Sequence, residues 1–445
     1  MAEEPKIRET ARRIFLRTLD EIDVGRVMPR RVSQDEPGSR LLLTGSEGSQ
    51  NSVSLAHAAV VIAIGKAAPG MAQAMNDILS GESQIKSGLI VTPVIPEERL
   101  GRFRYVRGGH PYPTEGSLEG AQAALELVSG LDRDDLVIFL ISGGGSALFE
   151  QPLDPAVTLG DLAGLNKLLV TCGLPIERMN VLRKHVSAVK GGRLAARAYP
   201  AAQVTIFISD VPEGLDSMVA SGPTFPDSST MDECYSLAES AGLVAQLPVS
   251  IRRRFEQRDL EETPKPGDAR FSRSHYCRLL SNRDAVEAAR LAAADAGFIA
   301  EVHQGEWDID FREAARAQSA ALDALASTHA GRPVCLVAGG EVISPVTGSG
   351  TGGRNQAFAL YAAGLITGRN RAVLSAGTDG RDGNSPASGA VADGTTLERA
   401  KNLGLDARRA LDSSDAYPFF KALDDTLETG YTGNNVRDVR VWLAT

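Results

Sequence analysis

Short apolar runs that end near glycine alternate with helical stretches along the chain, and this alternation limits the folds it can adopt. The clearest runs are AAVVIAIG (58–65), SGLIVT (87–92), RYVRGG (104–109), DLVIFLISGGGSA (135–147) and QVTIFIS (203–209). Strands that are apolar along their whole length must be covered on both faces, and helices between them provide that cover. The pattern therefore predicts an α/β fold built on a parallel sheet.

A second series of the same kind follows a proline-rich region, and we predict a domain boundary there. The region spans residues 222–275 and contains five prolines. After it, CRLLS (277–281) is predicted as a strand, 311–328 as a helix and 333–341 as a strand that runs into glycines. Before the first series, residues 7–22 predict an amphipathic helix and residues 29–52 a loop or short hairpin. We leave open whether residues 425–445 pack back on the first domain.

Composition excludes several classes of protein. A chain of 445 residues has room for two or three domains, and its net charge of -9 argues against a nucleic-acid or membrane-surface partner. The four cysteines are far apart, which gives no disulfide framework and favours a reducing compartment. The polar N-terminus shows no export signal, and the longest apolar run, 58–64, is too short for a bilayer. We therefore expect a cytoplasmic protein, either monomer or homodimer.

The region 339–383 concentrates glycine in an unusual way. It contains GGEVISPVTGSGTGGRNQ (339–356) and then SAGTDGRDG (375–383), and residues 348–353 alone contain four glycines. Glycine is entropically costly, so a cluster ahead of a helix usually brings backbone N–H groups close to an anion. No GxxxxGK[ST] loop occurs. The cluster therefore indicates an enzyme that handles phosphate without a Walker A loop.

Polar residues follow the predicted strands at the edge where ligands bind in open α/β sheets. They are Lys66 after 58–65, the turn Ser142-Gly143-Gly144-Gly145-Ser146 after 136–141, Asp210 after 203–209, Glu341 after 334–338, and Thr378 and Asp379 after 372–375. Arg354 emerges directly from the four-glycine loop, and its planar fork matches a phosphate or a carboxylate. These groups together indicate a two-domain enzyme with an anionic site, and phosphoryl transfer fits them.

Each of these residues also has a simpler interpretation. Lys66 could be a solvated loop lysine, the SGGGS turn could serve only helix packing, and Asp210 and Asp379 could each cap a helix. Two such acids, with Glu341 and Asn282 as further oxygen donors, are typical of Mg²⁺ binding beside phosphate. A serine nucleophile is excluded because no GxSxG surrounds either serine. We expect His110 to be structural or to orient substrate.

Eight ordered motifs extend through nearly the whole chain. They are GKAAPGMA (65–72), GGHPYPTEGS (108–117), SGGGSALFEQP (142–152), RKHVSAVKGGRLA (183–195), SDVPEGLDSMVASGPTFPD (209–227), GGEVISPVTGSGTGGRNQ (339–356), SAGTDGRDGNSPASGAVAD (375–393) and TGNNVRD (432–438). With these motifs the chain resembles the glycerate 2-kinase family from about residue 7 to 443.

The resemblance implies a kinase that uses ATP and Mg²⁺ to phosphorylate the 2-hydroxyl of D-glycerate, giving 2-phosphoglycerate. It implies a Rossmann-like three-layer α/β/α domain over residues 7–250, a smaller MOFRL-type α/β domain over 275–443, and an active site in the cleft between them. Lys66 and Arg354 match the family's catalytic lysine and arginine. SNRDA (281–285) departs from the GDN-like turn that the resemblance leads us to expect there, so the resemblance assigns no role to Asn282.

The predicted site combines both lines of reasoning. The catalytic residues are Lys66, Arg354, Asp210 and Asp379; the two aspartates also hold Mg²⁺ through phosphates or water, and which of them is the base is left open. The predicted substrate- and nucleotide-binding residues are Ser142, Gly143, Gly144, Gly145, Ser146, Glu341, Gly350, Gly352, Gly353, Asn355 and Thr378. Whether Arg354 meets the carboxylate or the phosphoryl group is also open. Two alternatives are a hydroxypyruvate reductase, which the lack of a GxGxxG turn disfavours, and a silent anion-binding protein.

Overall fold

The computed structural model describes residues 7–36, 38–45, 48–79, 84–305 and 308–445. The expectation about an export signal falls partly on residues 1–6, which lie outside the described residues. The chain forms two compact units. The N-terminal unit is Val24–Leu279, and the C-terminal unit combines the segment that ends at Asp23 with Leu280–Thr445.

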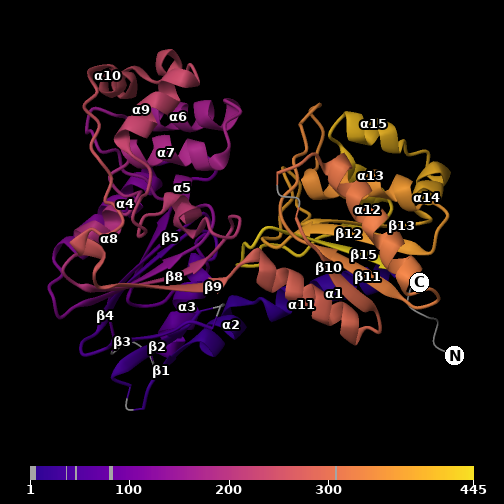
Figure 1. Ribbon diagram of the computed structural model, residues 1–445, viewed down its shortest axis with the longest axis horizontal. Helices are drawn as coiled ribbons and strands as arrows, with labels where there is room; N and C mark the ends of the chain where they lie inside the picture. Colours follow the sequence, from indigo (N-terminus) through magenta and orange to yellow (C-terminus); the bar gives the residue numbers. More distant parts are fainter. Residues whose placement is uncertain (1–6, 37, 46–47, 80–83, 306–307) are drawn as a thin grey trace. The chain divides into compact units, whose positions relative to one another are not determined.

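A six-stranded sheet forms the centre of the N-terminal unit (Figure 1). Its order is β6 (Phe103–Arg107), β5 (Ile85–Thr92), β4 (Ala59–Ile64), β7 (Leu136–Ile141), β8 (Ala202–Ile208) and β9 (Ser274–Leu280). The pairs from β6 to β8 are all parallel. All residues of β4 and β7 are buried, as their apolar sequences predict.

Helices cover both faces of this sheet. Helix α3 (Ala68–Ile78) packs on β4 and β5, whereas α4 (Glu115–Ser129) packs on β5 and β6 and against α8 (Arg193–Ala198). The crossover from β4 to β5 through α3 and the crossover from β6 to β7 through α4 run in opposite directions across the sheet. Because such crossovers are right-handed, the two helices lie on opposite faces. The predicted three-layer α/β/α architecture is confirmed.

The strand order places a ligand edge within this unit. With β4 to β9 renumbered one to six, the order is 3-2-1-4-5-6, which is that of the doubly wound α/β folds. The direction of winding reverses between β4 and β7. In such sheets ligands bind outside the carboxyl ends of the strands at this switch point. Lys66 and the SGGGS turn follow these two strands.

The rest of the N-terminal unit differs from the sequence prediction in two places. Instead of a loop or hairpin, β1 (Val32–Gln34), β2 (Arg40–Thr44) and β3 (Gln50–Ser54) form an antiparallel sheet after α2 (Val24–Arg31). The region 222–275 is not a boundary, because it contains α9 (Met231–Ser240) and α10 (Val249–Gln257). These helices share an apolar core with α6 (Leu159–Thr171) and α7 (Ile176–Val186), and Pro248 stands at the start of α10 rather than in a linker.

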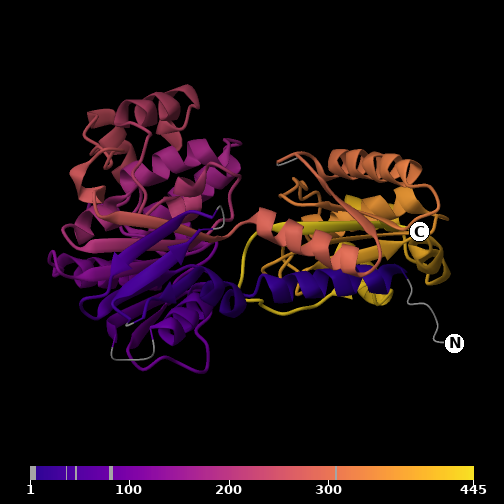
Figure 2. The ribbon, with the colours of Figure 1, turned by 60° about the horizontal axis from the view of Figure 1, so that its bottom comes forward.

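The C-terminal unit contains a second six-stranded sheet. Its order is β10 (Ile299–His303), β11 (Val334–Ala338), β15 (Asp438–Ala444), β12 (Arg371–Gly377), β13 (Gly389–Asp393) and β14 (Thr426–Leu427). Only β10 and β11 pair in parallel among the named strands, and the other pairs are antiparallel. Helices α12 (Phe311–Thr328) and α13 (Arg354–Ile366) pack on one face (Figure 2).

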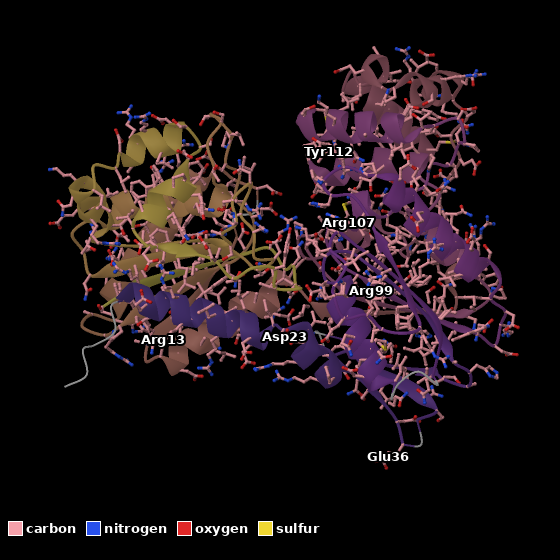
Figure 3. The ribbon with its side chains drawn as sticks, turned by 180° about the vertical axis from the view of Figure 1, so that it is seen from behind. Arg13, Asp23, Glu36, Arg99, Arg107 and Tyr112 are labelled. Atoms are coloured by element: carbon pink, nitrogen blue, oxygen red, sulfur yellow. The ribbon has the colours of Figure 1, made fainter. Side chains whose placement is uncertain are left out.

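The other face of this sheet corrects the predicted domain boundaries. It is covered by α11 (Asn282–Asp295) and by α1 (Ile7–Glu21), so the first helix belongs to the C-terminal unit. Figure 3 shows Arg13 on α1 and Asp23, where the chain leaves this unit. The final strand β15 lies inside the C-terminal sheet and not on the first domain. Conversely, residues 277–280 of the predicted strand 277–281 lie in β9, at the edge of the N-terminal sheet.

The remaining helices are short. They are α5 (Gly145–Leu148), α14 (Thr396–Asn402), α15 (Ala407–Asp412) and α16 (Ala416–Ala422), with 3₁₀ turns at Asp216–Ser221, Val244–Gln246 and Ala269–Phe271. None of the helices in the described part of the chain has the length and apolar character that a bilayer span needs.

Candidate functional site

In the N-terminal unit, Ser142 joins the ends of β4 and β7. Its N–H donates to Ile64 O at 2.9 Å, and its Oγ accepts from Ala67 N at 3.1 Å. The N–H of Lys66 donates to Gly143 O at 3.0 Å. Ser142 is completely buried. It was predicted to bind substrate, but these contacts give it a structural role: it fixes the turn that carries Lys66.

Two glycines bring Lys66 and His110 together. Gly65 has a φ of +122°, and a Cβ there would lie 2.2 Å from Ser142 Oγ. Gly144 has a φ of +85°, and its Cβ would lie 3.3 Å from both Lys66 Cγ and His110 Cδ2. His110 comes from the turn after β6, between Arg107 and Tyr112, both labelled in Figure 3. Lys66, Gly144 and His110 therefore lie next to one another at the switch point.

A strained backbone segment, which the sequence did not predict, packs against the SGGGS turn. Ala220, Ser221 and Gly222 have φ values of +53°, +62° and +64°. Left-handed backbone at consecutive non-glycine residues is costly and persists only where the surroundings enforce it. Here a Cβ on Gly145 would lie 2.5 Å from Ala220 Cβ, so the turn and this segment are packed tightly together.

Polar contacts connect this segment to α7. Ser146 Oγ lies 2.7 Å from Ser221 Oγ, and Ser221 Oγ donates to Asn180 Oδ1 at 3.0 Å. Arg183 Nη1 donates to the same Asn180 oxygen at 3.4 Å. Burial lowers the pKa of Arg183, and Glu150 opposes that shift. Arg183 lies in the motif RKHVSAVKGGRLA and Ser221 in the motif SDVPEGLDSMVASGPTFPD, but neither pattern by itself placed these residues beside Ser146.

Two buried ion pairs hold α7 and the following turn in place. Lys184 Nζ lies 3.1 Å from Asp227 Oδ1, and Lys190 pairs with Glu150. All four side chains are at most 5% exposed. Burial lowers the pKa of Lys190, and the Glu150 carboxylate opposes this. Removing one partner would leave a buried charge uncompensated, so these pairs are structural.

Asp210 follows β8 on the same sheet edge as the SGGGS turn. The register of β7 and β8 pairs Ile141 with Phe207, so the two strands end side by side. Asp210 is half-buried, and no helix begins there, since the next helical turn starts at Asp216. The helix-cap interpretation of Asp210 therefore does not apply. Burial raises the pKa of the neighbouring Asp216, which pairs with Arg278 at 3.2 Å.

In the C-terminal unit, Arg354 is held from two sides. Its Nε and Nη2 donate to the two oxygens of Asp438 at 2.6 and 2.9 Å, and its Nη1 lies 2.8 Å from Glu341 Oε1. Burial by itself would lower the pKa of Arg354, but Asp438 and Glu341 outweigh it and raise the pKa above its ordinary range. The side chain stays 31% exposed. A permanent cation is thus fixed where an anion can still reach it.

The glycine loop 348–353 packs against the protein itself, which differs from the predicted anion cradle. Gly350 N donates to Ser413 O at 3.1 Å, Thr351 N to Asp415 Oδ1 at 2.9 Å, and Gly352 N to Asn384 Oδ1 at 2.8 Å. These three N–H groups already have acceptors. The glycines allow close approach, because a Cβ on Gly350 would lie 2.5 Å from Asp415 Cβ.

The N-terminus of α13 is likewise occupied by a side chain, that of Asp382. Its carboxylate accepts from Asn355 N at 3.0 Å, from Gln356 N at 2.9 Å and from Gln356 Nε2 at 3.0 Å. Burial raises the pKa of Asp382 to about 6, against the opposing effect of these donors. Asp382 therefore sits where a phosphate was expected. Its pairing with Asn355, 27 residues away, left no local signal in the sequence.

Three further predicted polar residues are engaged in internal bonds. Asn355 is buried and accepts from Ser375 Oγ at 2.6 Å. Thr378 Oγ1 donates to Arg437 O at 2.7 Å and accepts from Val436 N at 2.9 Å. Asn282 donates to Val436 O at 2.7 Å and accepts from Gly340 N at 2.8 Å. These bonds connect the residues to neighbouring strands and loops of the C-terminal unit.

Asp379 remains a candidate for direct chemistry. It is half-buried in the turn after β12, and its Oδ1 accepts from Arg381 N at 3.1 Å, so it stabilises a turn rather than a helix start. A Cβ on Gly377 would meet Asp379 Oδ1 at 3.3 Å and Asp438 Oδ1 at 3.4 Å. Asp379 therefore lies close to the carboxylate that holds Arg354.

Within the residues that the structure describes, no group of three or more His, Cys, Asp or Glu side chains is arranged to hold a metal ion. Mg²⁺ needs only one or two carboxylates when phosphate and water supply its other ligands. Asp210 in the N-terminal unit and Asp379 in the C-terminal unit each have half-buried carboxylates of that kind. The donor chemistry of each is compatible with Mg²⁺.

Comparison with known proteins places these features in a family. Residues 10–256 match the family described as a domain of unknown function, DUF4147, and residues 334–438 match the MOFRL family. The chain is 37% identical to the D-glycerate 2-kinase of Thermotoga maritima, over 86% of this chain and 90% of the relative. It is 38% identical to a protein of Agrobacterium vitis named "Putative hydroxypyruvate reductase", over 86% of each. The crystal structure of glycerate kinase from Thermotoga maritima matches with a TM-score of 0.82 at 33% identity, over 98% of this chain and 99% of that one.

Proposed function

Because the chain belongs to the glycerate 2-kinase family, we propose that it transfers the γ-phosphoryl group of ATP to the 2-hydroxyl of D-glycerate, giving 2-phospho-D-glycerate and ADP. The observation that carries the proposal is the meeting of Lys66 with the SGGGS turn at the switch point of a doubly wound sheet. Phosphoryl transfer needs positioned cations and donors more than covalent chemistry, and the two units supply both.

In the N-terminal unit, the Lys66 ammonium is the cation and the SGGGS turn is the backbone donor. The turn that carries Lys66 is fixed by Ser142, and Gly144 leaves room for the lysine stem. We assign to these groups the neutralisation of phosphate charge or the binding of the glycerate carboxylate. A fixed cation costs no reorganisation when the phosphoryl group moves, and this is the usual source of catalysis in such sites.

In the C-terminal unit, Arg354 is the corresponding cation. Its bidentate contact with Asp438 fixes the plane of the guanidinium, and its exposure leaves it able to bind an oxyanion. Asp379 lies next to this pair and is one candidate for accepting the 2-hydroxyl proton, and Asp210 is the other. The glycine loop leads directly into Arg354 and donates its N–H groups to Ser413, Asp415 and Asn384, so it is not assigned to the ligand.

Mg²⁺ is proposed as the metal cofactor, with Asp210 or Asp379 as its protein ligand. When bound, Mg²⁺ would neutralise charge on the β- and γ-phosphates. The half-buried carboxylates of these aspartates, each at a strand end, support this assignment. Replacing either aspartate with asparagine and measuring the Mg²⁺ concentration needed for half-maximal activity would separate the metal ligand from the base.

Reductase activity is the alternative that a relative's name suggests. A dinucleotide site needs a glycine-rich turn after the first strand and an acid after the second to bind the ribose. Here β4 is followed by Gly65-Lys66-Ala67, and β5 ends at Thr92 and is followed by Pro93. Neither feature of a dinucleotide site is present at these positions, so the lysine turn favours phosphate chemistry.

A single assay distinguishes the candidates. Purified protein is incubated with ATP, Mg²⁺ and D-glycerate, and product is detected with enolase, which accepts 2-phosphoglycerate but not its 3-isomer. We expect signal without added mutase, and a loss of kcat/KM of about 10²–10³ in Lys66→Ala. Lys86→Ala, an exposed lysine of the same unit, is the matched control and should keep wild-type activity. Absence of ADP release would refute the kinase, and NADH oxidation with hydroxypyruvate would establish the reductase.

A further inference from the structure

Of the motif TGNNVRD, residues 432–438, the function proposed above uses only Asp438, yet the whole motif connects several parts of the C-terminal unit. Thr432 Oγ1 donates to Thr378 O at 2.6 Å, beside Asp379. Asn434 Nδ2 donates to Ile22 O at 2.6 Å, just after α1. Asn282 at the start of α11 donates to Val436 O and to Asp438 O. The segment, here named the 432–438 loop, is thus anchored on three sides before it reaches Asp438.

The last two residues of the 432–438 loop are Arg437, which contacts Glu341, and Asp438, which contacts Arg354. Asp438 accepts two bonds from Arg354, at 2.6 and 2.9 Å, and is completely buried. Arg437 Nη1 lies 3.0 Å from Glu341 Oε2, while Glu341 Oε1 lies 2.8 Å from Arg354 Nη1. Arg354 is therefore enclosed by a frame of two carboxylates, Asp438 and Glu341, and one end of the loop sets the position of both.

A frame of this kind matters because a free arginine side chain samples many rotamers. The bidentate contact fixes both the plane and the direction of the guanidinium. A misplacement of about 1 Å in a catalytic group can cost about 10²-fold in rate. The anchored loop removes that freedom before substrate binds.

We propose that Asp438 is a positioning residue for phosphoryl transfer: it acts through Arg354, which it holds in the orientation that meets the substrate anion, and Glu341 completes the frame. Because the role of Arg354 belongs to the kinase activity proposed above, this proposal rests on that activity. A purely structural ion pair is the competing explanation, and it predicts that losses of activity follow losses of stability.

The test is a double-variant cycle on the full chain, read as kcat/KM with D-glycerate and ATP. Asp438→Asn and Arg354→Ala should each lower kcat/KM by about 10²-fold or more. If Asp438 acts through Arg354, the double variant should be no worse than Arg354→Ala alone. Multiplied losses in the double variant, or wild-type kcat/KM in Asp438→Asn, would overturn the proposal. A wild-type protein that makes no 2-phosphoglycerate would instead refute the proposed function.

The matched control is Asp425→Asn in the same unit. Asp425 is 1% exposed and pairs at 2.6 Å with Arg399, which is 27% exposed, against 0% for Asp438 and 31% for Arg354. We expect Asp425→Asn to lower the thermal midpoint about as much as Asp438→Asn, with kcat/KM within twofold of wild type below that midpoint. An equal loss of kcat/KM in both variants would show that activity only tracks stability, and the proposal would fall.

If Asp438→Asn does not fold, Glu341→Gln provides the same test at a more exposed position. Glu341 is 32% exposed, so its replacement should leave the fold intact. We expect a loss in kcat/KM of about tenfold, the scale of one hydrogen bond, and no further loss when the change is made in Arg354→Ala. A tenfold loss that persists in the Arg354→Ala background would show that the frame does not act through Arg354.

Discussion

Lys66 and Gly144 depend on each other at the switch point of the N-terminal sheet. The lysine stem lies close to the place that a side chain on Gly144 would take, with 3.3 Å between Lys66 Cγ and the position of that Cβ. The φ of Gly144, +85°, is also one that other residues adopt only at a cost. The glycine is therefore favoured strongly by the backbone of the turn and further by the close approach of the lysine.

Replacing Gly144 with alanine should affect stability and activity together. The left-handed backbone should lower the free energy of unfolding by about 1–2 kcal/mol, and displacement of Lys66 should lower kcat/KM as well. Urea unfolding and steady-state kinetics measure the two effects. Gly160→Ala is the control, because Gly160 lies in the first turn of α6 with its nearest neighbour, Thr158 Oγ1, at 3.6 Å. A Gly144→Ala protein with wild-type kinetics would contradict the placement of Lys66.

At the scale of elements, the glycine loop and the turn that follows β12 form one packed structure. Asp382 binds the N-terminus of α13, and a Cβ on Gly353 would lie 2.3 Å from Asp382 Oδ1. Gly383 approaches as closely, with its Cβ position 2.2 Å from Gly352 O. The loop that carries Arg354 is thus held by a buried carboxylate, in the way that phosphate is held in other folds.

Gly353→Ala should disrupt this contact. We expect the free energy of unfolding to fall by about 1–3 kcal/mol, the usual cost of overpacking, with a loss of kcat/KM because Arg354 is the next residue. Gly364→Ala, later on the same helix with open space around it, should instead be stabilising by about 0.5–1 kcal/mol. Chemical denaturation of both variants provides the measurement, and equal stability of the two would contradict the tight packing at Gly353.

The segment after α10 is linked to α7 and α9 by Glu262. Its carboxylate lies 2.6 Å from Lys265 Nζ, accepts from Met231 N at 3.1 Å and lies 3.2 Å from His185 Nε2. Burial alone would raise the pKa of Glu262, but these partners lower it to about 2. A carboxyl group whose pKa is lower in the folded state than in the unfolded state stabilises the fold above its ordinary pKa. That contribution is lost as the pH falls.

Glu262→Gln should therefore have a pH-dependent effect on stability. At pH 7 we expect a loss of less than about 1 kcal/mol, since Glu262 is 42% exposed and solvent screens its contacts. The difference from wild type should shrink as the pH falls from 4.5 to about 2. Denaturant unfolding at several pH values measures it. Glu256→Gln, which removes a single contact to Arg252 at 3.7 Å, should stay within about 0.5 kcal/mol at pH 7. A difference that grows toward low pH would contradict the assigned contacts.

At the scale of the whole molecule, the C-terminal unit is discontinuous in sequence. Helix α1 packs on α11 and on strands β12, β13 and β15. Arg8 pairs with Asp393 at 3.1 Å, and Arg12 donates to Thr426 O at 2.8 Å. The first helix is therefore part of the core of a unit whose other residues begin at Leu280.

Phe15→Ala should weaken the C-terminal unit selectively. Phe15 is completely buried, and its loss should cost about 3–5 kcal/mol. Hydrogen exchange followed by mass spectrometry should show faster exchange in α11, β12 and β15, with β4 and β7 unchanged. Leu16→Ala, at a position 51% exposed, should leave the exchange pattern as in wild type. Faster exchange confined to β4 and β7 would contradict the assignment of α1 to this unit.

Elements with a strong local pattern were predicted well. The predicted helix 311–328 has the bounds of α12, and the strand at 58–65 contains β4. Periodicity and unbroken apolar runs are local properties, so they can be recognised from the sequence alone. The strand 277–281 was also found, but its sheet was not, because a strand's sequence favours extension without specifying a partner.

The amino-acid order alone established the α/β class, the family resemblance and the polar residues that follow each strand, since these depend on neighbours along the chain. Only the packed chain decided that Ser142, Asn355 and Thr378 form internal bonds, that Asp382 occupies the N-terminus of α13, and that α1 and β15 complete the C-terminal unit. The physical reason is that a hydrogen bond or an ion pair depends on distance in space. Arg354 and Asp438 are 84 residues apart along the chain, and their contact at 2.6 Å exists only once β15 has entered its sheet.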